Sequence, residues 1–113
     1  MSNIAIARFA KTPIDLTEEV VYQVPTGGAA TVTQIILCNT SASSVTVNIA
    51  ITAGTETSTI ASDRIFSEMS LAANETMMIS SDIMLLDGEK VWASASVDDV
   101  VDLFLSGVEQ TSV

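Results

Sequence analysis

The hydrophobic positions along this chain recur every second residue rather than every three or four. Residues 45–52 (VTVNIAIT) alternate apolar and polar side chains over the whole segment, which is typical of a strand buried on one face. Residues 31–38 begin with the same alternation and then become uniformly apolar, which indicates a strand covered on both faces at one end, or a bulge. The turn residues 39–44 between these two segments predict a hairpin.

Further segments carry the strand pattern next to turn residues. They are residues 20–24 before Pro25-Thr26-Gly27-Gly28, the short apolar runs 77–79 and 83–86, residues 91–96 after the Asp87-Gly88 turn, and residues 100–108 after the Asp98-Asp99 corner. Residues 54–67 are rich in Thr, Ser and Ala and are predicted to form a long loop. Residues 2–14 alternate only weakly and fit an edge strand or an extended arm.

Seven or eight short strands, spaced about ten residues apart, predict an all-β fold. We expect a two-sheet antiparallel β-sandwich, either Ig-like or jelly-roll. The length of 113 residues suits a single domain. We therefore expect an N-terminal arm or edge strand at residues 1–16, followed by a sandwich domain at residues 17–113.

The composition removes most catalytic chemistry. Histidine is absent and Cys38 is the single cysteine, so His-dependent nucleophilic catalysis, an internal disulfide and a cysteine-based metal cluster are excluded. We expect no enzyme activity and no cofactor. No apolar run approaches the length of a membrane span, and the first residues lack the layout of a signal peptide. We therefore expect no membrane partner and synthesis in a cytoplasm.

The formal net charge of −10 makes nucleic acid an unfavourable partner. The charge is unevenly distributed. Arg8 and Lys11 are the charged side chains before Asp15, whereas from Asp15 onward 14 acids stand against Arg64 and Lys90, a balance of −12. In an oligomer, this asymmetry favours contact between the basic arm of one subunit and the acidic body of its neighbour.

The remaining polar and aromatic candidates have structural explanations. Turn formation and solubility explain the carboxylates near the turns, although a calcium site remains an alternative; they are Asp82, Asp87, Glu89, Asp98, Asp99 and Asp102. Lys90 follows a turn and is expected to be solvated, and Cys38 is expected to be a small structural residue. Trp92 and Tyr22 are expected to anchor the core or the two sheets, with a ligand platform as the alternative.

Adjacent methionines in a strand point to opposite faces, so Met77 or Met78 is expected to point away from its own core. An exposed methionine suits a subunit interface. The candidate inter-subunit contacts are Ile4, Ile6, Arg8, Phe9, Lys11, Met77 and Met78.

The order of strands and turns is similar to that of a known group of proteins. The segments that carry this likeness are VYQVPTG at 21–27, IILCNT at 35–40, LAANET at 71–76, LDGEKVWASAS at 86–96 and LSGVE at 105–109. Over roughly residues 20–109 the chain resembles the small β-sandwich virion structural proteins of tailed bacteriophages, which serve as capsid decoration or cement proteins and as tail or fibre modules.

The resemblance implies a structural protein of the virion, assembled in the host bacterial cytoplasm. Its partners would be the major capsid protein or other virion proteins, and it would form a homo-oligomer, a trimer or a dimer. A capsid decoration or cement role is the leading hypothesis. A tail, baseplate or fibre component is the first alternative, and a carbohydrate-binding or adhesin module is the second.

Overall fold

The protein folds almost entirely into strands. The structure, a computed structural model, describes residues 2–112. The strands are β1 (Ser2–Ile14), β2 (Glu19–Gln23), β3 (Ala29–Asn39), β4 (Val45–Thr52), β5 (Arg64–Leu71), β6 (Thr76–Leu85), β7 (Lys90–Ala95) and β8 (Val101–Ser112). One 3-10 turn, η1 (Ala61–Asp63), precedes β5. No helix within the described residues is long and apolar enough to cross a membrane.

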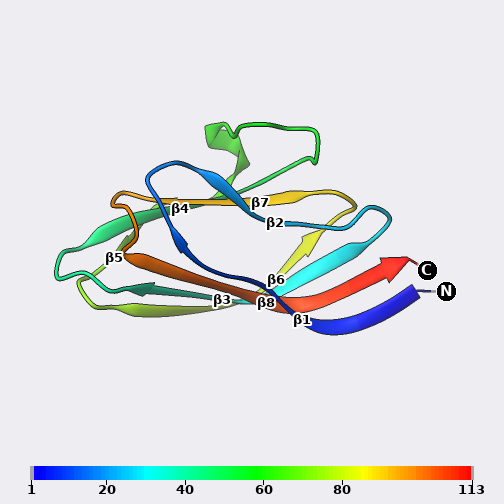
Figure 1. The fold of residues 1–113 in the computed structure, drawn as a ribbon, viewed down its shortest axis with the longest axis horizontal. Helices are drawn as coiled ribbons and strands as arrows, with labels where there is room; N and C mark the ends of the chain where they lie inside the picture. The colour runs from blue at the N-terminus through cyan, green and yellow to red at the C-terminus, as the bar shows by residue number, and fades with distance from the viewer. Residues whose placement is uncertain (1, 113) are drawn as a thin grey trace.

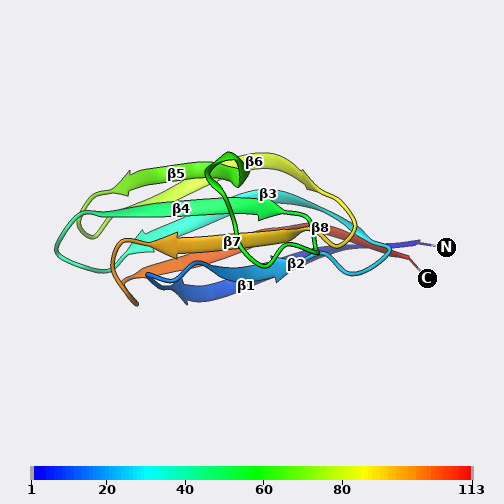
Figure 2. The same cartoon turned by 90° about the horizontal axis from the view of Figure 1, so that it is seen from above.

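The strands form two antiparallel four-stranded sheets packed face to face. Sheet A has the order β1-β8-β3-β6, and sheet B has the order β2-β7-β4-β5. Figure 1 shows the two layers edge-on, and Figure 2 looks down onto them. The molecule measures 49 × 26 × 19 Å, and β1 and β8 extend side by side toward the end where both termini lie. The predicted two-sheet antiparallel β-sandwich is confirmed.

The strand pairing identifies the sandwich as a jelly roll. β1 pairs with β8, β2 with β7, β3 with β6, and β4 with β5, so the chain pairs as one long hairpin. Alternate pairs of this hairpin fall into alternate sheets, and the contacts β3·β8 and β4·β7 join the pairs within each sheet. An eight-stranded double sheet of this kind is the jelly roll, which occurs in viral capsid and lectin domains.

Alternating side chains from both sheets fill the space between them. From sheet A, Ile35, Leu37, Leu103 and Leu105 are at most 1% exposed, and Ile49 of sheet B is fully buried. Each buried side chain of this size contributes about 1.5–3 kcal/mol relative to an exposed one. The period of two in the sequence is therefore the direct signature of this core.

Two sequence predictions about connections are wrong. Residues 31–38 and 45–52 do not form a hairpin, because β3 lies in sheet A and β4 lies in sheet B. The short apolar runs 77–79 and 83–85 belong to the single strand β6, and Leu86 follows its end. The Asp87-Gly88 turn also passes between sheets, and Gly88 has a positive φ of 75° that suits glycine.

The predicted loop 54–67 is wrong in its second part. Strand β5 begins at Arg64 and pairs with β4 as an edge strand of sheet B. The segment between β4 and β5 is a real loop, and it arches over the outer side of sheet B (Figure 1). One outer side of the sandwich is therefore covered by the chain itself.

Candidate functional site

The outer side of sheet A presents its side chains in five cross-strand rows. We call this surface the outer face. The rows, read from β1 through β8 and β3 to β6, are Ile4–Gln110–Ala29, Ile6–Val108–Thr31–Met84, Arg8–Ser106–Gln34–Ser80, Lys11–Phe104–Ile36–Met78 and Pro13–Asp102–Cys38–Thr76. Two of these rows are largely apolar, and a polar row separates them.

Large apolar side chains on the outer face are open to solvent. Ile6 is 92% exposed, Ile4 70%, Met84 69% and Met78 65%. Phe104, Ile36 and Val108 between them are half-buried. Pockets of about 200 Å³ and about 160 Å³ lie among these rows, one beside Ile4 and Met84 and the other beside Phe104. Contiguous exposed apolar surface of this extent marks an interaction site in soluble proteins.

A bulge in β1 sets which of its residues reach the outer face. The register shifts between Arg8 and Ala10, so Phe9 has no partner in β8. Phe9 turns toward sheet B and stacks on Tyr22 with ring centroids 4.4 Å apart, while Ala10 joins the core. Lys11 returns to the outer face beyond the bulge. The bulge therefore keeps both basic residues of β1 on one surface.

The structure divides the seven contact residues predicted from sequence. Ile4, Ile6, Arg8, Lys11 and Met78 lie exposed on the outer face. Phe9 and Met77 do not belong to this set, because both are half-buried and pack against the core.

Sequence reasoning missed several members of the outer face: Ile36, Met84, Phe104 and Val108. The available signal was the uniformly apolar end of residues 31–38, which was interpreted as two-sided burial or a bulge. β3 does carry a bulge at Thr33. Ile36, however, faces outward and is only half-buried. Cys38 also lies half-buried on this face rather than in the core, with Thr76 Oγ1 3.5 Å from its Sγ.

Positive and negative side chains occupy opposite edges of the outer face. Arg8 and Lys11 are exposed on β1, and the Lys11 amine lies 6.0 Å from the centroid of the Phe104 ring. Asp82 is exposed on β6, in the position between Ser80 and Met84. Asp102 is half-buried in β8. The other two basic residues, Arg64 and Lys90, are half-buried on sheet B.

The outer side of sheet B is built differently, because the β4–β5 loop closes over Trp92. Trp92 is 7% exposed, and its Nε1 donates a hydrogen bond of 2.8 Å to Thr52 Oγ1. Lys90 lies 5.8 Å from the Trp92 ring centroid and donates to the Glu56 carbonyl oxygen of the loop. Lys90 is therefore half-buried, contrary to the sequence prediction. Lys90 ties the loop to sheet B, and Trp92 is buried on the same side of the sheet rather than presenting a ligand platform.

Tyr22 links the two sheets near the end where the termini lie. Its phenol donates a hydrogen bond to Glu109 Oε2 of β8, and its ring stacks on Phe9 of β1. Burial raises the pKa of Tyr22 above its ordinary value, and the hydrogen bond to Glu109 and the negative charge of that carboxylate raise it further. Tyr22 is thus an inter-sheet anchor.

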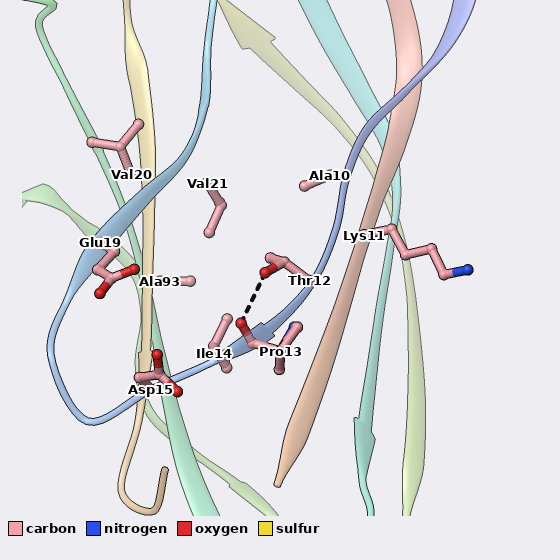
Figure 3. A pocket seen from close by; sticks show the side chains of 10 residues that line it. All are labelled: Ala10, Lys11, Thr12, Pro13, Ile14, Asp15, Glu19, Val20, Val21 and Ala93. Carbon is pink, nitrogen blue, oxygen red and sulfur yellow. Dashed lines mark hydrogen bonds between the residues drawn. The ribbon is translucent and has the colours of Figure 1, made fainter. Parts of the chain in front are cut away.

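A further pocket lies between the edge strands β1 and β2 (Figure 3). It has a volume of about 270 Å³ and is walled by Ile14, Val21 and Ala93, with Asp15 and Glu19 beside it. The Lys11 side chain points away from it (Figure 3). The pocket is an opening at the sandwich edge, lined by two carboxylates and by Thr12, whose hydroxyl donates a hydrogen bond to the Pro13 carbonyl oxygen.

The acids near the turns hold backbone groups. Asp98 accepts a hydrogen bond of 2.7 Å from the Leu16 amide, Asp87 accepts one of 2.8 Å from the Gly27 amide, and Glu89 accepts one from Leu86. Within residues 2–112 no group of three or more potential ligands of the His, Cys, Asp and Glu types comes together.

These features define the class of protein: a jelly-roll domain with one covered and one bare apolar face. No protein-family model matches the sequence, and no curated protein sequence matches it. Solved structures match the fold. A chain of the T13 particle of infectious bursal disease virus aligns with a TM-score of 0.57 at 8% identity. The alignment covers 96% of the present chain and 30% of the viral chain. A chain of the Gx strain of that virus aligns with a TM-score of 0.54 at 8% identity, over 97% of the present chain and 31% of the viral chain.

A third match has a different coverage. A chain of the acidic stable capsid structure of the Helicobacter pylori bacteriophage KHP30 aligns with a TM-score of 0.51 at 15% identity, over 100% of both chains. The present chain thus spans about 30% of the length of the two infectious bursal disease virus chains and the whole length of the phage chain. At these identities the matches show a shared fold.

Proposed function

We propose that this protein is a non-catalytic structural component of a bacteriophage virion, and specifically a decoration or cement subunit of the head. The observation that carries this proposal is the structural likeness to a chain of the KHP30 phage capsid structure, because the alignment covers the full length of both chains. In the infectious bursal disease virus chains the same fold is one part of a much longer chain. A jelly roll that accounts for the whole matched chain, as in the KHP30 structure, suits a subunit that is added to a shell.

The surface chemistry supports the same role. A cement subunit needs a rigid body and an exposed protein-binding surface, and it holds a shell through many repeated weak contacts. The outer face supplies such a surface, with exposed Ile6, Met78 and Met84 beside Arg8 and Lys11. The net charge of −10 keeps the protein off packaged nucleic acid. The partners under this proposal are the major capsid protein and other copies of this chain.

A carbohydrate-binding module is less consistent with the aromatic residues. Sugar sites use exposed aromatic rings, but Trp92 lies under the β4–β5 loop and Tyr22 stacks on Phe9. Both rings are committed to the packing of the sandwich itself.

The test is binding to empty shells assembled from the major capsid protein of the same genome. We expect the purified protein to co-sediment with the shells in a saturable way and to raise the temperature at which they break. The matched variants are Ile6→Asp on the outer face and Ile60→Asp on the β4–β5 loop, both at exposed positions. Ile6→Asp should weaken retention, because it removes a contact of the outer face with the shell or with a second copy on the shell, and Ile60→Asp should not. A protein that neither co-sediments with the shells nor stabilises them would overturn the proposal.

A further inference from the structure

We infer that the partner of the outer face is a second copy of this chain, bound face to face about a twofold axis that runs parallel to the strands. The inference deepens the proposed function and rests on it only in treating the outer face as a protein interface. The resulting dimer would present two sets of the remaining surfaces to a shell.

The first argument is the opposite charge at the two edges of the outer face. Arg8 and Lys11 lie on the β1 edge, and Asp82 lies on the β6 edge. Three inter-strand spacings of about 4.8 Å separate these edges, so roughly 14 Å lies between them. Arg8 and Asp82 are therefore too far apart to pair within one chain. They are placed to pair between two chains.

A twofold axis parallel to the strands brings these edges together. It lays β1 of one copy over β6 of the other and β8 over β3, with each cross-strand row facing the same row of its partner. Arg8 then meets the stretch of β6 that contains Ser80 and Asp82, and the symmetry makes this contact twice. The Coulomb attraction of these pairs fixes the orientation of the two copies more than it adds to affinity.

The same axis also places apolar side chains of two rows over one another. In the row that contains Phe104, Phe104 of one copy lies over Ile36 of the other at the centre of the interface. In the row that contains Ile6, Ile6 lies over Met84. Central aromatic and aliphatic contacts of this kind carry most of the energy of an interface. The polar row places Ser106 over Gln34, where their side chains can share hydrogen bonds.

The alternative twofold axis, perpendicular to the strands, is unfavourable. Where it crosses the polar row, this axis would lay β1 on β1 and bring Arg8 against Arg8 of the second copy, with no carboxylate opposite either arginine. Like charges placed opposite each other across an interface disfavour that arrangement. The charge pattern therefore selects one of the two face-to-face arrangements.

The size of the outer face is sufficient for a dimer. Four strands spaced about 4.8 Å apart and ten residues rising about 3.3 Å each define roughly 600 Å² per copy. The total of about 1,200 Å² lies at the lower limit of stable interfaces. Sheets packed face to face lie about 10 Å apart, which the side chains of these rows can fill. We therefore expect a dimer with a dissociation constant on the order of micromolar.

The experiment is sedimentation equilibrium of the intact protein and two charge-reversal variants. The wild type should approach twice its monomer mass of 11.9 kDa as concentration rises. Arg8→Asp and Asp82→Arg should each raise the dissociation constant at least about tenfold, because each places like charges opposite one another twice. Glu56→Arg, the same charge change on the exposed β4–β5 loop, should leave the constant unchanged.

Mixing the two variants tests the geometry directly. In a mixed dimer of Arg8→Asp with Asp82→Arg, both cross-copy contacts regain opposite charges, so an equimolar mixture should dimerise more tightly than either variant alone. This recovery also shows that both variants are folded. A wild type that stays monomeric, a trimer, a dimer insensitive to both reversals, or a mixture that fails to recover would each overturn the inference. A monomer that still binds shells would leave the proposed function standing, and a dimer that binds none would refute the function alone.

Discussion

At the scale of single residues, a buried polar side chain with several hydrogen-bond partners contributes strongly to the stability of the fold. Asn39 is fully buried at the end of β3. Its amide donates to the Ser43 and Ala72 carbonyl oxygens at 2.8 and 3.0 Å, and its carbonyl accepts from the Ser41 amide and hydroxyl. It therefore joins the β3–β4 loop to the turn after β5. Asn39, which the sequence suggests is an ordinary turn residue, thus holds two connections of the sandwich together.

Replacing Asn39 should be costly for this reason. Asn39→Ala removes four hydrogen bonds at a fully buried position, among them the one from the Ser41 amide, and we expect a loss of about 2–4 kcal/mol in the free energy of unfolding. Asn48→Ala, at a half-buried position where the side chain accepts one hydrogen bond from the Glu68 amide, should cost about 1 kcal/mol. Urea denaturation with an unchanged m-value measures both. Equal losses in the two variants would contradict this account of Asn39.

Tyr22 predicts the response to alkaline pH. Because its pKa is raised in the folded state, the phenol is protonated in both states below the ordinary value of 10.0, and its contribution to stability is fully present there. Above pH 10.0 the unfolded chain releases the proton first, so stability is lost as pH rises through the folded-state pKa.

Tyr22 is the single tyrosine, so the tyrosinate absorbance reports its titration directly. We expect titration above pH 10.0 in the folded protein and a smaller upward shift in Glu109→Gln, which removes the negative charge but not the burial. Titration at the ordinary value in the folded wild type would show that Tyr22 is not packed as described.

At the scale of elements, the alternation of side chains was readable in the sequence, whereas the sheet to which each strand belongs was not. Burial alternates along residues 45–49 of β4 as the sequence predicts, whereas Ala50 and Thr52 are also buried, so the end of the strand is covered on both sides. The connection 40–44 is short enough for a hairpin, yet it crosses from sheet A to sheet B. Turn residues predict that the chain reverses direction, but they do not determine which strand the next segment pairs with.

Strand β5 shows a second limit. Its burial pattern is irregular because a register shift in β4·β5 lies near Glu68, which has a φ of 50°. As an edge strand it also exposes Ser67 and Ser70. A polar edge strand with a broken period resembles a loop in sequence. The outer face was likewise only partly predictable, because an apolar residue such as Ile36 or Phe104 has the same signature whether it faces a core or a partner chain.

The pairing of β3 with β8 predicts a sharp intolerance at Gly107. A Cβ atom at Gly107 would lie 2.0 Å from the Thr31 carbonyl oxygen, so Gly107→Ala must push β3 and β8 apart. We expect a loss of at least about 3 kcal/mol and a fall in Tm of more than about 10 °C.

Gly88→Ala is the matched control. Nothing lies within 4 Å of its Cβ position, and the positive φ of 75° alone should cost about 1 kcal/mol. Calorimetric unfolding of both variants provides the comparison. A Gly107→Ala protein as stable as Gly88→Ala would mean that β3 and β8 are not held at this spacing.

At the scale of the whole molecule, the two outer sides of one sandwich have different roles. The β4–β5 loop covers Trp92 on sheet B, while sheet A presents two apolar rows and a positively charged edge in a chain of net charge −10. Under the proposed function this bare face serves assembly with other protein chains. Variants of the outer face should therefore alter association without unfolding the domain.

The most direct measurement of the central proposal is the number of copies of this protein per particle, counted by quantitative mass spectrometry of purified virions from the genome that encodes it. The account predicts a number comparable to that of the major capsid protein, and retention of the protein on the heads after tails are removed. A small multiple of three or six that leaves with the tails would identify a tail component, and absence from the particles would contradict a virion role altogether.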